Sequence, residues 1–208
     1  MKPKEFAKKE HFTFEDLKNL VEFLRSPDGC SWDREQTHES IRCHFIEEAY
    51  EVAEGIDKKD NELLCEELGD MLFQVLFHAD LAREEGAFLL SHVIDGICKK
   101  MIRRHPHLFS ENKEMADWEE IKKAEKGEKT KKDTLSRIST SLPALMRAVK
   151  FIEKGADLPE NNDFSSKEDK LGAKLFRLVS ECEKEKVDPE AALNHYLEKI
   201  ILNCTNYE

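Results

Sequence analysis

Polar side chains interrupt one apolar stretch of the sequence at spacings that place them on one side of a helix. Residues 68–82 are almost all apolar, and the polar residues of interest in or directly before this stretch are Glu67, Asp70, Gln74 and His78. Because a helix turns by about 100° per residue, these four side chains fall on one narrow strip. A polar strip on a buried helix is unfavourable unless another group satisfies it, so this strip is the first candidate for chemistry.

A milder version of this pattern comes earlier in the chain. Glu48 lies at the edge of an apolar stripe, and Glu51 lies beside that stripe one turn later. Glu47 and Glu54 point further round the same helix, toward solvent. The stripe consists of Ile41, Phe45, Ala49, Val52, Ala53 and Ile56.

The short polar connection at residues 57–60 predicts that the two segments form an antiparallel helical hairpin. The first pair of glutamates can then face the strip on the second helix, which gathers Glu48, Glu51, Glu67 and Asp70. Carboxylates gathered in a partly desolvated place repel one another, and a hard divalent cation such as Mg²⁺ removes that repulsion. Such an ion can neutralise phosphate oxygens and activate water. The alternative is a solvated glutamate-rich surface, because E-x-x-E spacings are common by chance.

A basic cluster follows near residues 99–104. Lys100 and Arg104 are four residues apart and share a helical face with which they can bind one polyphosphate, and Lys99 and Arg103 lie beside them. The alternative is that these cations only stabilise a helix C-terminus, where positive charge is favourable.

Composition favours long helices and disfavours several kinds of partner. The chain has 8 Gly and 6 Pro among 208 residues, so turns are few. A net charge of −11 repels nucleic acid and anionic membranes. No apolar run approaches the roughly 20 residues that span a bilayer, and the charged N-terminus does not resemble a secretion signal. Six scattered cysteines without a C-x-x-C pair favour reduced thiols in the cytoplasm.

The periodicity predicts an all-α bundle whose hairpin carries the carboxylates, followed by a smaller helical C-terminal region. Thr13 and Asp60 are candidate helix caps. Residues 26–33 contain Pro and Gly and are expected to form a loop, and the highly charged residues 116–133 are expected to form a solvated helix running into a linker. The expected helices span residues 14–25, 37–56, 60–85, 91–103, 139–154, 166–186 and 189–203.

Several of these residues together resemble the MazG-type nucleoside triphosphate pyrophosphohydrolases. The resemblance covers about residues 14–125 and depends on motifs that are weak singly but occur in one order. These motifs are Gly29-Cys-Ser-Trp-Asp33, Gln36-Thr-His38, Glu47-Glu-Ala-Tyr-Glu51, Glu66-Glu-Leu-Gly-Asp70 and Arg103-Arg-His-Pro-His107. One departure is Ser31, where the family usually has proline.

The resemblance implies a fold, a cofactor and roles for the candidate residues. It implies an all-α protein that binds Mg²⁺, with Mn²⁺ as a possible substitute. The implied metal ligands are Glu48, Glu51, Glu67 and Asp70, whereas Glu47 belongs to the motif without needing to touch the metal. The implied catalytic residues are Lys100, Arg104 and Glu48.

The family also assigns substrate contacts. Lys100, Arg103 and Arg104 would contact phosphates. Trp32 would stack on a base, and Gln36 or His38 would hydrogen-bond a base or sugar. The alternative for Trp32 is that it anchors its loop in the core.

A faint internal repeat indicates a second, eroded copy of this domain. Residues 68–76 resemble residues 171–179, and in this alignment Lys170 and Ala173 replace the acidic residues of the strip. We therefore expect a catalytic domain at 1–125, a charged linker at 126–133 and a shortened, degenerate second domain at 134–208. This last domain is expected to support packing or dimerisation.

The expected function is hydrolysis of nucleoside triphosphates to a monophosphate and pyrophosphate, as nucleotide-pool housecleaning in the cytoplasm. We expect a homodimer, because one hairpin cannot cover helices this apolar, and no nucleic-acid or membrane partner. One alternative is a pyrophosphohydrolase of narrow specificity, for dUTP or a phosphoribosyl nucleotide. The other is a helical protein that binds nucleotides without cleaving them.

Overall fold

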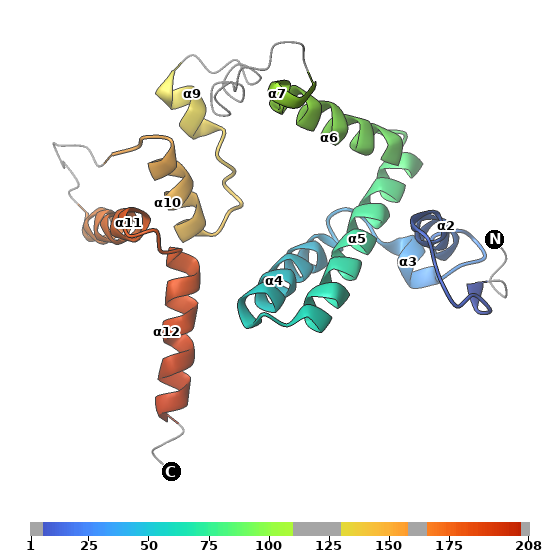
Figure 1. The fold of residues 1–208 in the computed structure, drawn as a ribbon, viewed down its shortest axis with the longest axis horizontal. Helices are drawn as coiled ribbons and strands as arrows, with labels where there is room; N and C mark the ends of the chain where they lie inside the picture. The colour runs from blue at the N-terminus through green and yellow to red at the C-terminus, as the bar shows by residue number, and fades with distance from the viewer. Residues whose placement is uncertain (1–5, 110–129, 158–165, 205–208) are drawn as a thin grey trace. The chain divides into compact units, whose positions relative to one another are not determined.

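The computed structural model describes residues 6–109, 130–157 and 166–204. Within these ranges every regular element is a helix, which confirms the expected all-α fold (Figure 1). The chain divides into two compact units, Met1–Met115 and Ala116–Glu208. The finer division at 125 and 133 stays a prediction. Over the same described ranges, no helix combines the length and apolar character needed to cross a membrane.

Helix α2 (Phe14–Leu24) begins as the sequence predicts. The Thr13 hydroxyl accepts a hydrogen bond from the Asp16 backbone N–H, and the Thr13 backbone N–H donates to the Asp16 carboxylate in return. This capping box satisfies donors that would otherwise be unpaired at the helix start. The Lys9 ammonium also contacts this carboxylate and holds the pKa of Asp16 at about 2.

The expected loop at residues 26–33 is only partly a loop, because it runs into the short helix α3 (Ser31–Glu35). Its turn is pressed against the end of α2. A Cβ on Gly29 would lie 2.2 Å from the Phe23 carbonyl oxygen, so no other residue fits there without a shift of the backbone. The loop therefore packs closely and fixes where α3 starts.

Helices α4 (Arg42–Lys58) and α5 (Asn61–Glu84) form the predicted antiparallel hairpin (Figure 1). Asp60 caps α5 by accepting hydrogen bonds from two backbone N–H groups. Lys59 adopts the left-handed conformation that ends α4, with φ of 56°. Near this turn the helices approach closely, because the Cβ missing from Gly55 would lie 3.0 Å from the Leu64 Cα atom.

The expected start of α4 near Thr37 is wrong by several residues. Thr37 and Ser40 instead form a reciprocal turn, in which the backbone N–H of each donates to the hydroxyl of the other, at 2.9 and 3.2 Å. Short hydroxyl side chains compete in this way with helical hydrogen bonds. The segment before α4 is therefore a separate turn.

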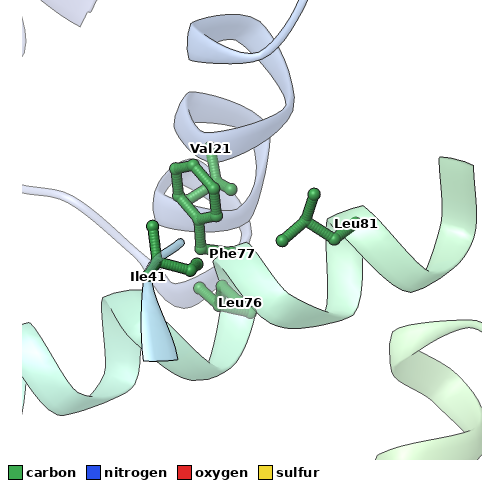
Figure 2. Packing of buried hydrophobic residues seen from close by; sticks show 5 residues of the cluster. All are labelled: Val21, Ile41, Leu76, Phe77 and Leu81. Carbon is green, nitrogen blue, oxygen red and sulfur yellow. The ribbon is translucent and has the colours of Figure 1, made fainter. Parts of the chain in front are cut away.

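The buried core of the first unit lies where α2 and the segment before α4 meet the C-terminal half of α5. Its buried members are Val21, Ile41, Leu76, Phe77 and Leu81 (Figure 2). The N-terminal half of α5 is more open, with Leu68 and Leu72 exposed by 51% and 38%. The described part of the chain thus leaves this half of α5 partly open, as expected for helices that one hairpin cannot cover.

A buried arginine that the sequence did not single out ties several segments together. Arg25, only 3% exposed, donates to the Asp80 carboxylate at 3.2 Å, to the Glu84 carboxylate at 2.5 Å and to the Asp33 carbonyl at 2.6 Å. Its guanidinium also lies 4.8 Å from the centre of the Phe77 ring. The end of α2, helix α3 and the end of α5 are therefore joined through one side chain.

Helices α6 (Leu90–Arg104) and α7 (Pro106–Phe109) complete the described part of the first unit. Helix α6 ends just before Pro106, as predicted. No residue of α6 is buried. Even its large apolar side chains Ile94, Ile97 and Ile102 are exposed, by 44%, 45% and 49%. Residues 6–109 therefore leave an apolar side of this helix open.

The second unit contains α9 (Lys131–Ser136), α10 (Ala144–Glu153), α11 (Lys167–Lys184) and α12 (Pro189–Cys204). The last two agree with the predicted helices. The helix expected from residue 139 starts only after Pro143, because a proline disfavours helical geometry in the residue before it. Helix α9 begins inside the expected linker, and residues 110–129, which carry most of the charged run, lie outside the described residues.

Candidate functional site

Three of the four predicted metal ligands come together on the hairpin. One carboxylate oxygen from each of Glu48, Glu67 and Asp70 lies within 4.8 Å of the other two. Glu48 comes from α4, and the other two come from successive turns of α5. The short connection between the helices and the three-residue spacing on α5 produce this convergence.

The fourth predicted ligand, Glu51, lies beside this group without belonging to it. It is exposed, one turn after Glu48 on α4. Its carboxylate interacts with the Glu48 side chain and its charge acts on Glu67. Glu47 is exposed and contacts His44 at 3.0 Å, as its outward position on the helix predicted.

The surroundings of Glu48 and Glu67 disfavour their negative charge. Burial raises the pKa of Glu67, and the charges of Glu51 and Asp70 raise it further. Burial is also the main cause that raises the pKa of Glu48, with Asp70 adding to it, whereas a hydrogen bond from Gln74 acts in the opposite direction. A cation bound among these oxygens would lower the pKa values of the carboxyl groups and favour their ionised forms.

Gln74 links the carboxylates to the rest of the polar strip. It is 8% exposed, and its amide Nε2 donates to the Glu48 carboxylate at 3.4 Å. A buried amide in this position orients one oxygen of Glu48 and leaves the other oxygen available. Gln74 therefore acts on the carboxylate group from the next turn of α5.

The predicted basic residues lie on the last turns of α6. Lys100 and Arg104 are partly buried and Arg103 is exposed. In Figure 1, α6 leaves the C-terminal end of α5, whereas Glu67 and Asp70 belong to the N-terminal half of α5.

Two of the expected base-contacting residues, Trp32 and Gln36, lie on α3 and directly after it. Trp32 is 56% exposed on α3, so it is not a core anchor. The Gln36 amide donates to the Trp32 carbonyl at 2.8 Å and accepts from the Ser40 hydroxyl at 2.7 Å. The Gln36 side chain therefore holds the turn before α4 together.

The third, His38, packs against His78 from the polar strip. Their rings are nearly parallel, with centroids 5.0 Å apart, and their Nδ1 atoms are 2.7 Å apart. Phe45 lies edge-on to His78, with centroids 5.6 Å apart. These side chains line a pocket of about 500 Å³ between α4, α5 and the start of α6. The sequence indicated each histidine separately but not their contact.

The described part of the second unit does not reproduce the carboxylate group. The positions that the internal repeat aligns with Glu67 and Asp70 are Lys170 and Ala173, and both lie on α11. Across the described part of this unit, no three acidic, histidine or cysteine side chains converge closely enough to share a metal ion.

Comparison with known proteins agrees with this geometry. Residues 36–109 match the family model of the MazG nucleotide pyrophosphohydrolase domain. The nucleoside triphosphate pyrophosphohydrolase/pyrophosphatase MazG of Thermotoga maritima is 40% identical, over 90% of this chain and 82% of that protein. The chain belongs to the MazG family.

Two other MazG relatives are longer than this chain. The nucleoside triphosphate pyrophosphohydrolase of Escherichia coli is 42% identical over 68% of this chain but only 57% of its own length. The uncharacterised protein YabN of Bacillus subtilis is 45% identical over 66% of this chain and 29% of its own length. The MazG match at 36–109 contains the carboxylates, the histidine pair and the basic residues of α6, and it leaves out Trp32.

Proposed function

We propose that this protein hydrolyses nucleoside triphosphates to a nucleoside monophosphate and pyrophosphate, with Mg²⁺ or, in its place, Mn²⁺ held by the carboxylates of the hairpin. The observation that carries the proposal is the convergence of Glu48, Glu67 and Asp70 within 4.8 Å. Membership of the MazG family supports it, and so does the activity for which the Thermotoga maritima and Escherichia coli relatives are named.

The donor set fits a hard divalent cation. All three converging groups are carboxylates, which are the ligands that Mg²⁺ prefers, and Glu51 can supply a fourth oxygen at the edge of the group. The raised pKa values of Glu48 and Glu67 agree with a site that is unfavourable without a positive charge. When bound, the ion would neutralise phosphate oxygens and lower the pKa of a coordinated water.

The chain's own residues then have separate tasks. Glu67 and Asp70 would hold the ion, and the hydrogen bond from Gln74 would orient Glu48, whose carboxylate accepts a proton from the attacking water. Attack at phosphorus breaks the P–O bond between the α- and β-phosphates. The attacked phosphorus keeps the hydroxyl, Glu48 passes its proton to the oxygen of the departing phosphate, and positioning supplies most of the acceleration.

Lys100 and Arg104 are proposed to bind the negative charge of the phosphates, with Arg103 beside them. Because no residue of α6 is buried in the structure, we propose that α6 packs on a second copy in a homodimer. The exposed Ile94, Ile97 and Ile102 supply the apolar face for this contact. The second unit would support this assembly rather than catalyse.

We place the reaction in the cytoplasm, where thiols stay reduced. All six cysteines are free in the structure, which suits a reducing compartment. The family's housecleaning of surplus nucleotides is the proposed role.

The test is pyrophosphate release from a panel of nucleoside triphosphates with and without Mg²⁺, run beside Asp70→Ala. The proposal requires Mg²⁺-dependent release that Asp70→Ala abolishes while its helical circular dichroism stays unchanged. Nucleotide binding without any turnover in the natural sequence would instead favour a non-catalytic binding protein.

A further inference from the structure

We propose that the pocket around His38 and His78 binds the nucleobase of the substrate, with His78 as the residue that reads a base N–H group. The inference depends on the proposed function and names the part of the substrate that this pocket recognises. The carboxylates would hold the phosphates, and the histidine pair, further along the same two helices, would hold the base.

The distance along α5 between the carboxylates and the pocket suits a substrate whose phosphates bind at the carboxylates and whose base binds in the pocket. Eight residues separate Asp70 from His78, which corresponds to about 12 Å of helix. On α4, Phe45 lies one turn before Glu48, so the same two helices carry both the carboxylates and the pocket. An extended ribose triphosphate covers a comparable length between its base and its outer phosphates.

The walls of the pocket suit a flat heteroaromatic ring. Phe45, Ile46 and Val75 supply apolar surface from the hairpin, and Phe88 and Val93 close the pocket from the start of α6. Aromatic and aliphatic side chains around a few polar groups are typical of small-molecule sites. Arg42 lies at the same pocket and adds a cation that can stack on a ring.

The contact between the histidines determines which ring nitrogen in the pocket can accept a hydrogen bond from a ligand. With their Nδ1 atoms 2.7 Å apart, one ring must donate and the other must accept. The His38 Nε2 atom lies 3.9 Å from the Glu85 carboxylate, which favours the tautomer with the proton on that nitrogen. His38 then accepts at Nδ1, His78 donates from Nδ1, and the His78 Nε2 atom is left as an acceptor for a ligand N–H group.

The electrostatic surroundings keep this acceptor available. Burial lowers the pKa of His78, and the neighbouring His38 lowers it further. Both effects favour the neutral ring, whose Nε2 retains its lone pair. Every common nucleobase carries an exocyclic amino group or a ring N–H that can donate to it.

The kinetic test compares substrates with and without a base. The four common ribonucleoside triphosphates and ribose 5-triphosphate are assayed with the natural protein, His78→Leu, His38→Leu and the control His11→Leu, in which the replaced histidine is exposed. Loss of one hydrogen bond predicts that His78→Leu lowers kcat/KM about tenfold for the preferred nucleotide. Hydrolysis of ribose 5-triphosphate should not change, and His11→Leu should behave like the natural protein. Equal losses on both substrates would overturn the inference.

A binding experiment separates this inference from the proposed reaction. Nucleosides without phosphate are titrated into the Mg²⁺-free protein and into Asp70→Ala, and the imidazole resonances are followed by NMR. The pocket predicts that His38 and His78 shift in both proteins, whether or not any triphosphate is hydrolysed. Unchanged imidazole resonances at millimolar nucleoside would refute the pocket. So would a base preference that Trp32→Ala removes and His78→Leu leaves intact.

Discussion

Replacing Gly55 with alanine tests how closely α4 and α5 approach each other in the hairpin. Alanine at this position would place its Cβ 3.0 Å from both the Cα and the N atom of Leu64 and 3.2 Å from its Cβ. Two of these atoms are backbone, so the extra methyl group can be accommodated only if α4 and α5 move apart. The carboxylates lie on the same two helices, and therefore their spacing should change as well.

The expected change in the free energy of unfolding follows from two opposing effects. Alanine in a helix is about 1 kcal/mol more favourable than glycine, whereas overpacking a close contact costs about 1–3 kcal/mol. The matched control is Gly96→Ala on α6, because a Cβ on Gly96 meets nothing within 4 Å. Gly96→Ala should therefore stabilise by about 1 kcal/mol, and the two variants should differ by about 1–3 kcal/mol.

Thermal unfolding with and without Mg²⁺ measures both the change in stability and the effect of the altered carboxylate spacing on metal binding. A difference of 1 kcal/mol corresponds to roughly 4–8 °C in Tm for a unit of this size. Gly55→Ala should have the lower Tm and should also gain less Tm from Mg²⁺ than Gly96→Ala does. If both alanines raise Tm equally, the close approach of α4 to α5 at this position is refuted.

Three further predictions concern the charges of the first unit. Without Mg²⁺, Glu67→Gln should unfold at a higher temperature than the natural protein, because it removes one of the converging charges. At a concentration of 100 times its Kd, Mg²⁺ should stabilise the natural protein by about 2.7 kcal/mol, measured as a Tm increase that this variant lacks. Arg25→Met should destabilise by about 1–3 kcal/mol in urea unfolding, because one oxygen of the buried Asp80 carboxylate loses its donor while Arg83 still pairs with the other oxygen. Asp16 has a pKa of about 2, below its ordinary 3.8, so its contribution should be complete above that ordinary value and disappear as the pH falls toward 2. Urea unfolding across this pH range should show a smaller dependence for Asp16→Asn.

Each of these predictions has a contrary outcome. A Tm that does not respond to Mg²⁺ at any millimolar concentration would contradict a preformed metal site. An Arg25→Met variant as stable as the natural protein would mean that the buried ion pair adds no net stability. Equal pH dependence for Asp16→Asn and the natural protein would show that another carboxylate is responsible.

The hairpin and most of its carboxylates follow from local patterns. Asp60 marks a helix start, the connection is too short for anything but an antiparallel neighbour, and three-residue spacing aligns Glu67 with Asp70. These are short-range properties of the chain, and the structure agrees with them. The metal and the role of each ligand stay predictions.

What the sequence did not reveal depends on contacts between distant residues. Arg25 meets Asp80 across 55 positions, and His38 meets His78 across 40. No periodicity encodes such pairs. The late start of α4 has a local cause instead, since the turn formed by Thr37 and Ser40 competes with the helix that periodicity alone predicts.

The guanidinium of Arg25 also restricts how the protein can move. Because it binds the carbonyl of Asp33 as well as two acids at the end of α5, the short helix that carries Trp32 cannot swing away without breaking that bond and exposing the guanidinium of a residue that is now only 3% exposed. A substrate that needs more room must therefore obtain it elsewhere. Helix α6 has no buried residue, so its displacement would leave the described core of the first unit in place.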